Sequence, residues 1–320
     1  MIACDIKQTA ALISAAGKIA ITAHIKPDPD ALGSILGLGL GLRKLGKDIV
    51  MTVDDELPKS LDFMPRLSEI KSLDSTDKQK VDLLIVLDAS DRERSGRVPE
   101  VFGGPILNID HHISNTGFSE YRYLDIEAAA TGEIVYQLLT ELNVPIDLDI
   151  AKNLYTAIVT DCGFFQYSNT TTKTMEQAAQ LLHYGVKPDE IHFALESKSR
   201  SSVELLAEVL KTLEFFNEER IAVLSLSHDK YNPDVDTEGF IAFARYINGV
   251  EIAVFVKEID ANTTRVSMRS KKIDVSKVAL HFSGGGHVRA AGCTIHTKLS
   301  EAKSLLLEQL GKAIAEYKNA

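Results

Sequence analysis

An almost unbroken run of apolar residues from Val81 to Leu87 constrains the fold of this chain more than any other stretch of its sequence. A strand with one face in water would alternate apolar and polar residues, and here only Asp82 is polar. Continuous apolar strands are typical of parallel sheets whose two faces are both covered by helices. The run therefore predicts an α/β fold that is built on a parallel sheet.

The flanking sequence alternates strand and helix patterns, as a parallel sheet with crossover helices requires. We predict further strands at Ile19–Ile25, Asp48–Val53 and Pro105–Ile109. We predict helices at Ala31–Leu45, Thr131–Asn143, Leu148–Thr160 and Lys173–Tyr184. Together these elements predict an N-terminal domain over residues 1–190.

The rest of the 320 residues predicts a second domain, because a chain of this length exceeds one typical core. A charged helical pattern at residues 191–216 is interpreted as a helical linker between the two domains. A smaller α/β domain is predicted over residues 217–320. Its predicted strands are Ile221–Leu226, Val250–Lys257 and Arg265–Arg269, and its predicted helices are Gly239–Tyr246 and Ser300–Tyr317.

The charge and the N-terminus narrow the function classes. A net charge of −10 argues against a protein that binds long nucleic acid, although it permits a small nucleotide substrate. The N-terminus lacks the pattern of a signal peptide, and no apolar run approaches the roughly 20 residues of a membrane span. Three cysteines without a paired spacing favour a reducing compartment. We therefore expect a cytoplasmic protein that has no membrane partner.

A first group of metal-competent side chains, His24, Asp28 and Asp30, lies at the end of the strand predicted at Ile19–Ile25 and in the turn after it. Pro27 and Pro29 alternate with the two aspartates, and prolines are excluded from helix interiors. The pattern therefore predicts a rigid turn that holds both carboxylates outside the helix. Capping of the next helix by Asp30 is the alternative interpretation of that residue.

Three further groups lie at the ends of apolar segments. Asp88 follows the Val81–Leu87 run, Asp110-His111-His112 follows the strand predicted at Pro105–Ile109, and Asp161 ends a predicted helix. Ligands of open α/β sheets bind at the carboxyl ends of the strands. Each aspartate could also be a helix cap, so no single group identifies a function.

The groups together indicate a metal centre. They contain five carboxylates and three imidazoles at the edge of one predicted sheet, and that much negative charge repels itself without compensation. Carboxylate ligands with a few imidazoles suit Mn²⁺ or Mg²⁺ better than a structural zinc site. Two such ions about 4 Å apart can generate a hydroxide and stabilise a phosphoryl transition state. The sequence therefore predicts a two-metal phosphohydrolase.

The C-terminal half carries a glycine-rich segment, Gly284-Gly285-Gly286-His287. Glycines allow backbone N–H groups to approach a phosphate or a base closely, and His287 adds a donor. Arg269 ends a predicted strand and could clamp a phosphate. An ordinary turn and a surface arginine are the alternative interpretations.

These clusters resemble the DHH/DHHA1 phosphoesterase family, whose marks are the Asp110-His111-His112 triplet and the Gly284–His287 segment. The resemblance spans nearly the whole chain in the family's order. It is greatest with the subgroup of bifunctional oligoribonucleases and 3′-phosphoadenosine 5′-phosphate (PAP) phosphatases. It implies a parallel-sheet DHH domain, a DHHA1 domain, and an active site in the cleft between them.

The resemblance also implies roles for individual residues. One Mn²⁺ ion would be held by His24, Asp28 and Asp88, and a second by Asp30, Asp88, His111 and Asp161. Mg²⁺ or Co²⁺ could replace Mn²⁺. His112 and Asp110 would be catalytic, with His112 at the scissile phosphate and Asp110 orienting the histidines. Substrate would be held by Arg94, Arg269, Gly285, Gly286 and His287.

The implied reaction is hydroxide attack, at two metal ions, on short oligoribonucleotides (nanoRNA) or on PAP. A manganese inorganic pyrophosphatase and a cyclic- or linear-dinucleotide phosphodiesterase are the alternatives within the same chemistry. A catalytically silent nucleotide sensor is the alternative outside it. The sequence does not rank the substrates or give the cleavage direction, and a homodimer is only a working hypothesis.

Overall fold

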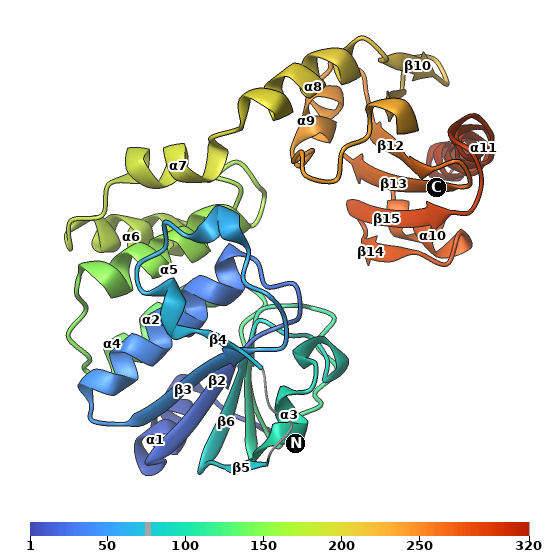
Figure 1. The fold of residues 1–320 in the computed structure, drawn as a ribbon. Coiled ribbons are helices and arrows are strands. Elements are labelled where there is room, and N and C mark those ends of the chain that lie inside the picture. Colours follow the sequence, from blue (N-terminus) through green and yellow to red (C-terminus); the bar gives the residue numbers. More distant parts are fainter. Residues whose placement is uncertain (74–77, 320) are drawn as a thin grey trace. The chain divides into compact units, whose positions relative to one another are not determined.

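The computed structural model describes residues 1–73 and 78–319, with the side chain of residue 287 and those from residue 318 onward excepted (Figure 1). The chain divides into two compact units, one that ends at Glu196 and one that begins at Ser197. Within the described residues, every helix is too short or too polar to span a membrane.

The first unit is built on a seven-stranded sheet in which every neighbouring pair is parallel. Its order is β1 (Ile2–Ala3), β9 (Tyr121–Leu124), β8 (Ile106–Asp110), β6 (Leu83–Leu87), β2 (Lys18–Thr22), β3 (Asp48–Val53) and β4 (Lys71–Ser72). Strand β5 (Gln79–Lys80) pairs separately with β7 (Phe102–Gly103). The sheet confirms the predicted α/β class.

The apolar strand β6 is buried on both faces, as predicted. Leu83, Ile85 and Leu87 belong to the larger core, whereas Leu84 and Val86 belong to a smaller core on the opposite face. The larger core lies under α1 (Ile6–Ala15), α2 (Pro29–Lys44), α4 (Thr131–Glu141), α5 (Leu148–Asp161), α6 (Thr172–Leu182) and α7 (Pro188–Glu196). The smaller core lies under α3 (Val98–Val101). Helix α2 packs against both α4 and α5 (Figure 1).

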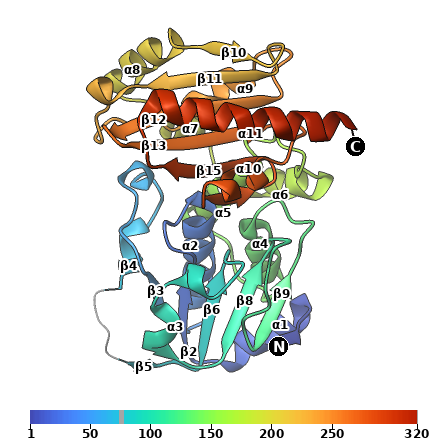
Figure 2. The same ribbon diagram turned by 90° about the vertical axis from the view of Figure 1, so that its right-hand side faces the viewer.

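The second unit contains a six-stranded mixed sheet. Its order is β10 (Glu214–Phe216), β11 (Ile221–Leu226), β12 (Ile252–Asp260), β13 (Thr263–Ser270), β15 (Ala290–Ile295) and β14 (Gly285–His287), and only β11 and β12 pair in parallel. One face packs against α10 (Val275–His281) and the long α11 (Leu299–Asn319), which lies in front of the sheet in Figure 2 and runs roughly along its strands. The other face packs against α8 (Arg200–Leu210) and α9 (Phe240–Arg245).

Two stretches of the second half differ from the predicted elements. Residues 191–216 are not one helical stretch, because α7 ends at Glu196, α8 begins at Arg200 and β10 is a strand. The side chain of Ser199 accepts a hydrogen bond from the Ser202 N–H and so starts a new helix. The glycine-rich segment, predicted as a turn, contains the edge strand β14. Pairing with β15 determines its conformation.

Candidate active site

Three adjacent parallel strands, β8, β6 and β2, end beside one another at the candidate site. His24 follows β2 by two residues, Asp88 follows β6 directly, and Asp110 is the last residue of β8. Strand β2 lies between β3 and β6. The chain adds β3 and β4 on one side of β2 and then returns to add β6 and β8 on the other side, so the strand order reverses here. This is the position at which open α/β sheets bind their ligands.

Helix α2 starts earlier than predicted. Asp28 is its N-cap and accepts a hydrogen bond from the Ala31 N–H at 3.0 Å, while Pro29 occupies the first turn. The prediction that Asp30 lies outside the helix, or caps it, is therefore wrong. A proline is tolerated in the first turn because the N–H it lacks would have no helical acceptor there.

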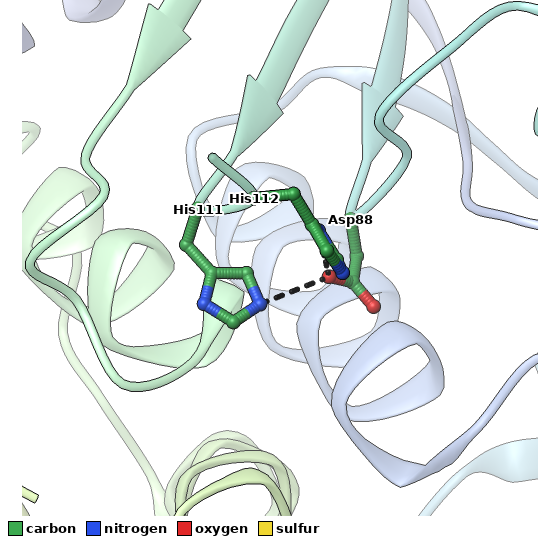
Figure 3. Close-up of side chains that lie close together, drawn as sticks. All are labelled: Asp88, His111 and His112. Atoms are coloured by element: carbon green, nitrogen blue, oxygen red, sulfur yellow. Dashed lines mark ion pairs between the residues drawn. The ribbon is translucent and has the colours of Figure 1, made fainter. Parts of the chain in front are cut away.

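Six predicted residues converge in two sets of three. His24, Asp28 and Asp88 form one set, and Asp30, His111 and Asp161 form the other; a third group of Asp88, His111 and His112 overlaps both. The donor atoms within each set lie within 4.8 Å of one another. Asp88 also joins the sets, because its Oδ2 lies 3.3 Å from His24 Nε2 and its Oδ1 lies 3.5 Å from His111 Nε2. Figure 3 shows the His111 and His112 rings beside Asp88, with a broken line from His111 to its carboxylate.

The donor atoms fit divalent cations. The Nε2 atoms of His24 and His111 lie 3.3–3.5 Å from Asp28, Asp88 and Asp161 oxygens. With metal–ligand bonds of about 2.1 Å, neighbouring donors of one ion lie about 3.0–3.4 Å apart. The Nδ1 atoms face backbone carbonyl oxygens instead, of Ile25 at 2.8 Å and of Ala128 at 3.1 Å. Such contacts fix the tautomer that leaves Nε2 available to a metal.

The charges of the metal-free cluster are strongly coupled. Burial lowers the pKa of His24, but the carboxylates of Asp28 and Asp88 outweigh burial and raise it to about 10. The same opposition raises the pKa of His111 to about 10. Burial and the neighbouring Asp88 raise the pKa of Asp161 to about 6. Carboxylates therefore need cations at this position, and protonated histidines provide them when metal is absent.

The Asp30 carboxylate lies at the N-terminus of α4. It accepts hydrogen bonds from the Thr131 N–H at 2.7 Å and the Gly132 N–H at 2.9 Å. The N-cap residue, Ala130, has no side chain that could do this. Thr131 also donates its hydroxyl to Asp88 Oδ1 at 3.1 Å. Sequence reasoning missed Thr131 and Gly132, because ordinary N-cap signals are absent before α4.

Asp110 is completely buried and contacts both histidines that follow it. Its Oδ1 accepts from the His111 backbone N–H at 2.9 Å and lies 2.7 Å from His112 Nδ1. His112 Nδ1 also lies 3.6 Å from Asp88 Oδ1. Because Asp110 already binds Nδ1, the His112 ring has only Nε2 available to a metal or a substrate. Asn115 donates to the other Asp110 oxygen at 2.6 Å.

The remaining predicted residues lie outside this cluster. Arg94 belongs to the turn after β6, where its N–H donates to Asp91 and its carbonyl accepts from Ile25. Arg269 is on β13 and lines a cavity of about 370 Å³ with Lys257 and Arg265. Gly285 and Gly286 are on the edge strand β14. The side chain of His287 lies outside the part of the structure that is described.

The two glycines of β14, Gly285 and Gly286, differ in the space that a side chain would have. A Cβ on Gly286, whose φ is +137°, would lie 2.5 Å from the Ala290 carbonyl oxygen, whereas a Cβ on Gly285 would meet nothing within 4 Å. Gly286→Ala is therefore expected to lower the free energy of unfolding by about 1–3 kcal/mol. Gly285→Ala is expected to leave it unchanged and, if substrate approaches this backbone, to raise KM about tenfold, which equals about 1.4 kcal/mol. Thermal unfolding and steady-state kinetics of both variants check this; equal loss of stability would contradict it.

Comparison with known proteins places this geometry in a family. The sequence profile described as the DHH family, N-terminal domain, matches residues 18–158, and that of the DHHA1 domain matches residues 219–316. A Thermus thermophilus protein named bifunctional oligoribonuclease and PAP phosphatase NrnA is 34% identical over 302 residues, which cover 94% of this chain and 89% of that protein. The chain belongs to the DHH/DHHA1 family.

Two further similarities, one to a curated protein and one to a solved structure, agree with this family assignment. A Bacillus subtilis protein with the same name is 28% identical over 89% of this chain and 91% of its own length. The crystal structure of an exopolyphosphatase-related protein from Bacteroides fragilis superposes with a TM-score of 0.89 and 27% identity, covering 98% of this chain and 96% of that one. As a member of this family, the protein is a metal-dependent phosphohydrolase.

Proposed function

We propose that this DHH/DHHA1 protein uses two Mn²⁺ ions to hydrolyse short oligoribonucleotides to mononucleotides, and PAP to AMP and phosphate. The observation that carries the metal proposal is that two sets of three donors meet at Asp88. The names of the relatives from Thermus thermophilus and Bacillus subtilis support these substrates. We assign His24, Asp28 and Asp88 to one ion, and Asp30, Asp88, His111 and Asp161 to the other.

Bound divalent ions would lower the pKa of water and neutralise phosphate oxygens. The protein's own contribution is to hold the ligands rigidly and to place His112 next to them. His112 Nδ1 is held by Asp110 at 2.7 Å, which fixes the orientation of the ring. We propose that His112 contacts the scissile phosphate and supplies a proton to the leaving ribose oxygen.

The second unit is proposed to bind the nucleotide. Arg269 lines its cavity together with Lys257 and Arg265, and these three cations outnumber the two carboxylates of Asp236 and Glu238 in the same lining, so a phosphate or ribose could be held there. We assign Arg269, Gly285, Gly286 and His287 to this role, and Arg94 to phosphate contact in the first unit. A net charge of −10 supports a preference for short substrates, because a long polyanion would be repelled away from the site. We place this activity in the cytoplasm.

Other activities of the same chemistry are less favoured. A manganese inorganic pyrophosphatase needs no nucleotide-binding unit, whereas a DHHA1 domain matches residues 219–316 here. A cyclic-dinucleotide phosphodiesterase would use the same metal ligands. Only the substrate that the enzyme accepts separates it from the proposed activity. A catalytically silent nucleotide sensor is disfavoured because all six positions carry a side chain that can bind metal, and these side chains converge.

A substrate panel tests the proposal. The protein is treated with EDTA, dialysed, and assayed with and without added Mn²⁺ on a diribonucleotide, PAP, a cyclic dinucleotide and pyrophosphate. We expect mononucleotide from the diribonucleotide and phosphate from PAP, both only with Mn²⁺, because the carboxylates cannot activate water alone. Turnover of pyrophosphate alone, or full activity after chelation, would refute the proposed function.

A further inference from the structure

The Asn115 side chain lies at the centre of a hydrogen-bond network in the loop after β8. Its Nδ2 donates to Asp110 Oδ2 at 2.6 Å and to Asn108 Oδ1 at 2.8 Å. Its Oδ1 accepts from the Gly117 N–H at 2.9 Å. Arg122 donates to the same oxygen at 3.4 Å. The amide therefore uses both its donors and its acceptor within the protein.

One branch of this network ends at His112. The two oxygens of the buried Asp110 have different partners, since Oδ1 faces His112 Nδ1 and Oδ2 faces Asn115. A carboxylate bonded on both oxygens cannot rotate about its Cβ–Cγ bond without breaking one of them. The bond from Asn115 therefore fixes the carboxylate plane, and through it the orientation of the imidazole of His112.

The other branch ends on both sides of Asp88. Asn108 is fully buried and donates to the Val86 carbonyl oxygen and to the Ala89 carbonyl oxygen, each at 3.1 Å. Asp88 lies between those two residues with φ of +53°, a left-handed conformation that residues other than glycine rarely adopt. The amide of Asn108 therefore braces the turn that presents Asp88 to both donor sets, and Asn115 bonds to that amide.

We propose that Asn115 is a positioning residue that holds His112 in its productive orientation relative to Asp88. The proposal rests on the proposed function and adds to it a residue whose hydrogen bonds go to none of the six proposed metal ligands. An amide is needed here because one side must donate to Asp110 while the other accepts from Gly117. An aspartate would lose the donor and place a second carboxylate against Asp110.

A double-mutant cycle tests this role on the intact enzyme with a diribonucleotide and saturating Mn²⁺. We expect Asn115→Ala to lower kcat about 10–100-fold, with KM changed less than about threefold, as for residues that orient catalytic groups. In a His112→Ala background, the same substitution should lower kcat clearly less than it does in the parent, because the effect that passes through His112 is already lost and only the branch through Asn108 remains. Additive losses, or a raised KM with normal kcat, would overturn the proposal.

Two further variants keep the test decisive. Ser114→Ala, in the exposed neighbour on the same loop, should keep kcat and KM of the parent. If Asn115→Ala lowers the unfolding temperature by more than a few degrees, Asn115→Asp takes its place, and its kcat should fall at least as far. Asn115→Asp with parental kcat would refute the need for a donor.

A measurement that needs no turnover separates this proposal from the proposed function. With diamagnetic Mg²⁺ in place of Mn²⁺, the His112 Nδ1 proton, identified by its loss in His112→Ala, should give a downfield proton resonance in the parent and should shift or broaden in Asn115→Ala. An unchanged resonance would refute the positioning role even in an active enzyme. A changed resonance in a protein that hydrolyses none of the substrate panel would uphold the role and refute only the proposed function.

Discussion

Replacing Asp88 with asparagine is expected to abolish hydrolysis while the fold is retained. Asp88 contacts both donor sets, through His24 on one side and His111 on the other. Substitution of outer partners of a metal site typically costs about 10–100-fold, so loss of a carboxylate shared by both sets should lower kcat at least about 10³-fold. Asparagine keeps the shape of the side chain and tolerates the φ of +53°.

The metal dependence of stability gives this prediction a second measurement. Burial would raise the pKa of Asp88, but hydrogen bonds from His111 and His24 hold the pKa below its ordinary value, so the residue is charged at neutral pH. A ligand at 100 times its Kd stabilises a protein by about 2.7 kcal/mol, or roughly 5–11 °C for a unit of this size. We expect Mn²⁺ to raise the unfolding temperature of the parent in this way but not that of Asp88→Asn.

Asp91→Asn provides the matched control. It also replaces an aspartate with asparagine, but at a position three residues after Asp88 that belongs to neither donor set. It should retain activity within a few-fold and keep the Mn²⁺-induced rise in unfolding temperature. Near-parental turnover by Asp88→Asn, or an undiminished rise with Mn²⁺, would contradict the shared role of Asp88.

Gly33→Ala in α2 is expected to destabilise the first unit. A Cβ at this position would lie 2.5 Å from the Asn153 carbonyl oxygen and 3.0 Å from the Ala157 Cβ, so backbone of α5 would have to move. Overpacking typically costs about 1–3 kcal/mol, and a rigid backbone neighbour places this site at the upper end. The gain of about 1 kcal/mol from replacing a helical glycine does not offset it. The unfolding temperature should fall by roughly 2–8 °C.

Gly311→Ala makes the same change in α11, where a Cβ would meet nothing within 4 Å. Here only the helix preference operates, so the free energy of unfolding of the second unit should rise by up to about 1 kcal/mol. Thermal unfolding of both variants distinguishes packing from propensity. Equal or greater stability of Gly33→Ala would show that α2 and α5 can separate at little cost.

The positions of several candidate site residues were predictable because they follow a rule of topology. His24 and Asp88 follow apolar strands and Asp110 ends one, and the carboxyl ends of adjacent parallel strands must meet at one edge. The apolar run before Asp88 was long enough to identify its strand, and both of its faces are covered. The sequence could not reveal the supporting contacts, since Thr131 N–H binds a carboxylate 101 residues earlier in the chain.

The interpretation of local sequence patterns failed where a helix cap or the pairing of a short strand decides the conformation. The proline pattern predicted a turn at Asp30, but α2 already begins at Pro29, because the first turn of a helix needs no proline N–H. Helical composition over 191–216 hid the break that Ser199 makes by capping α8. Strand β14 is short and rich in glycine, so only its pairing with β15 makes it a strand.

The bond between Asp30 and the start of α4 has a consequence for how the molecule is made. The first amides of α4 donate to a carboxylate that lies 101 and 102 residues earlier in the chain. During synthesis, therefore, the nascent chain cannot assemble the second donor set until the ribosome has released Asp161 as well. Under the proposed assignment, the first donor set is complete in sequence at Asp88, whereas a second ion can be held only after Asp161 has been synthesised.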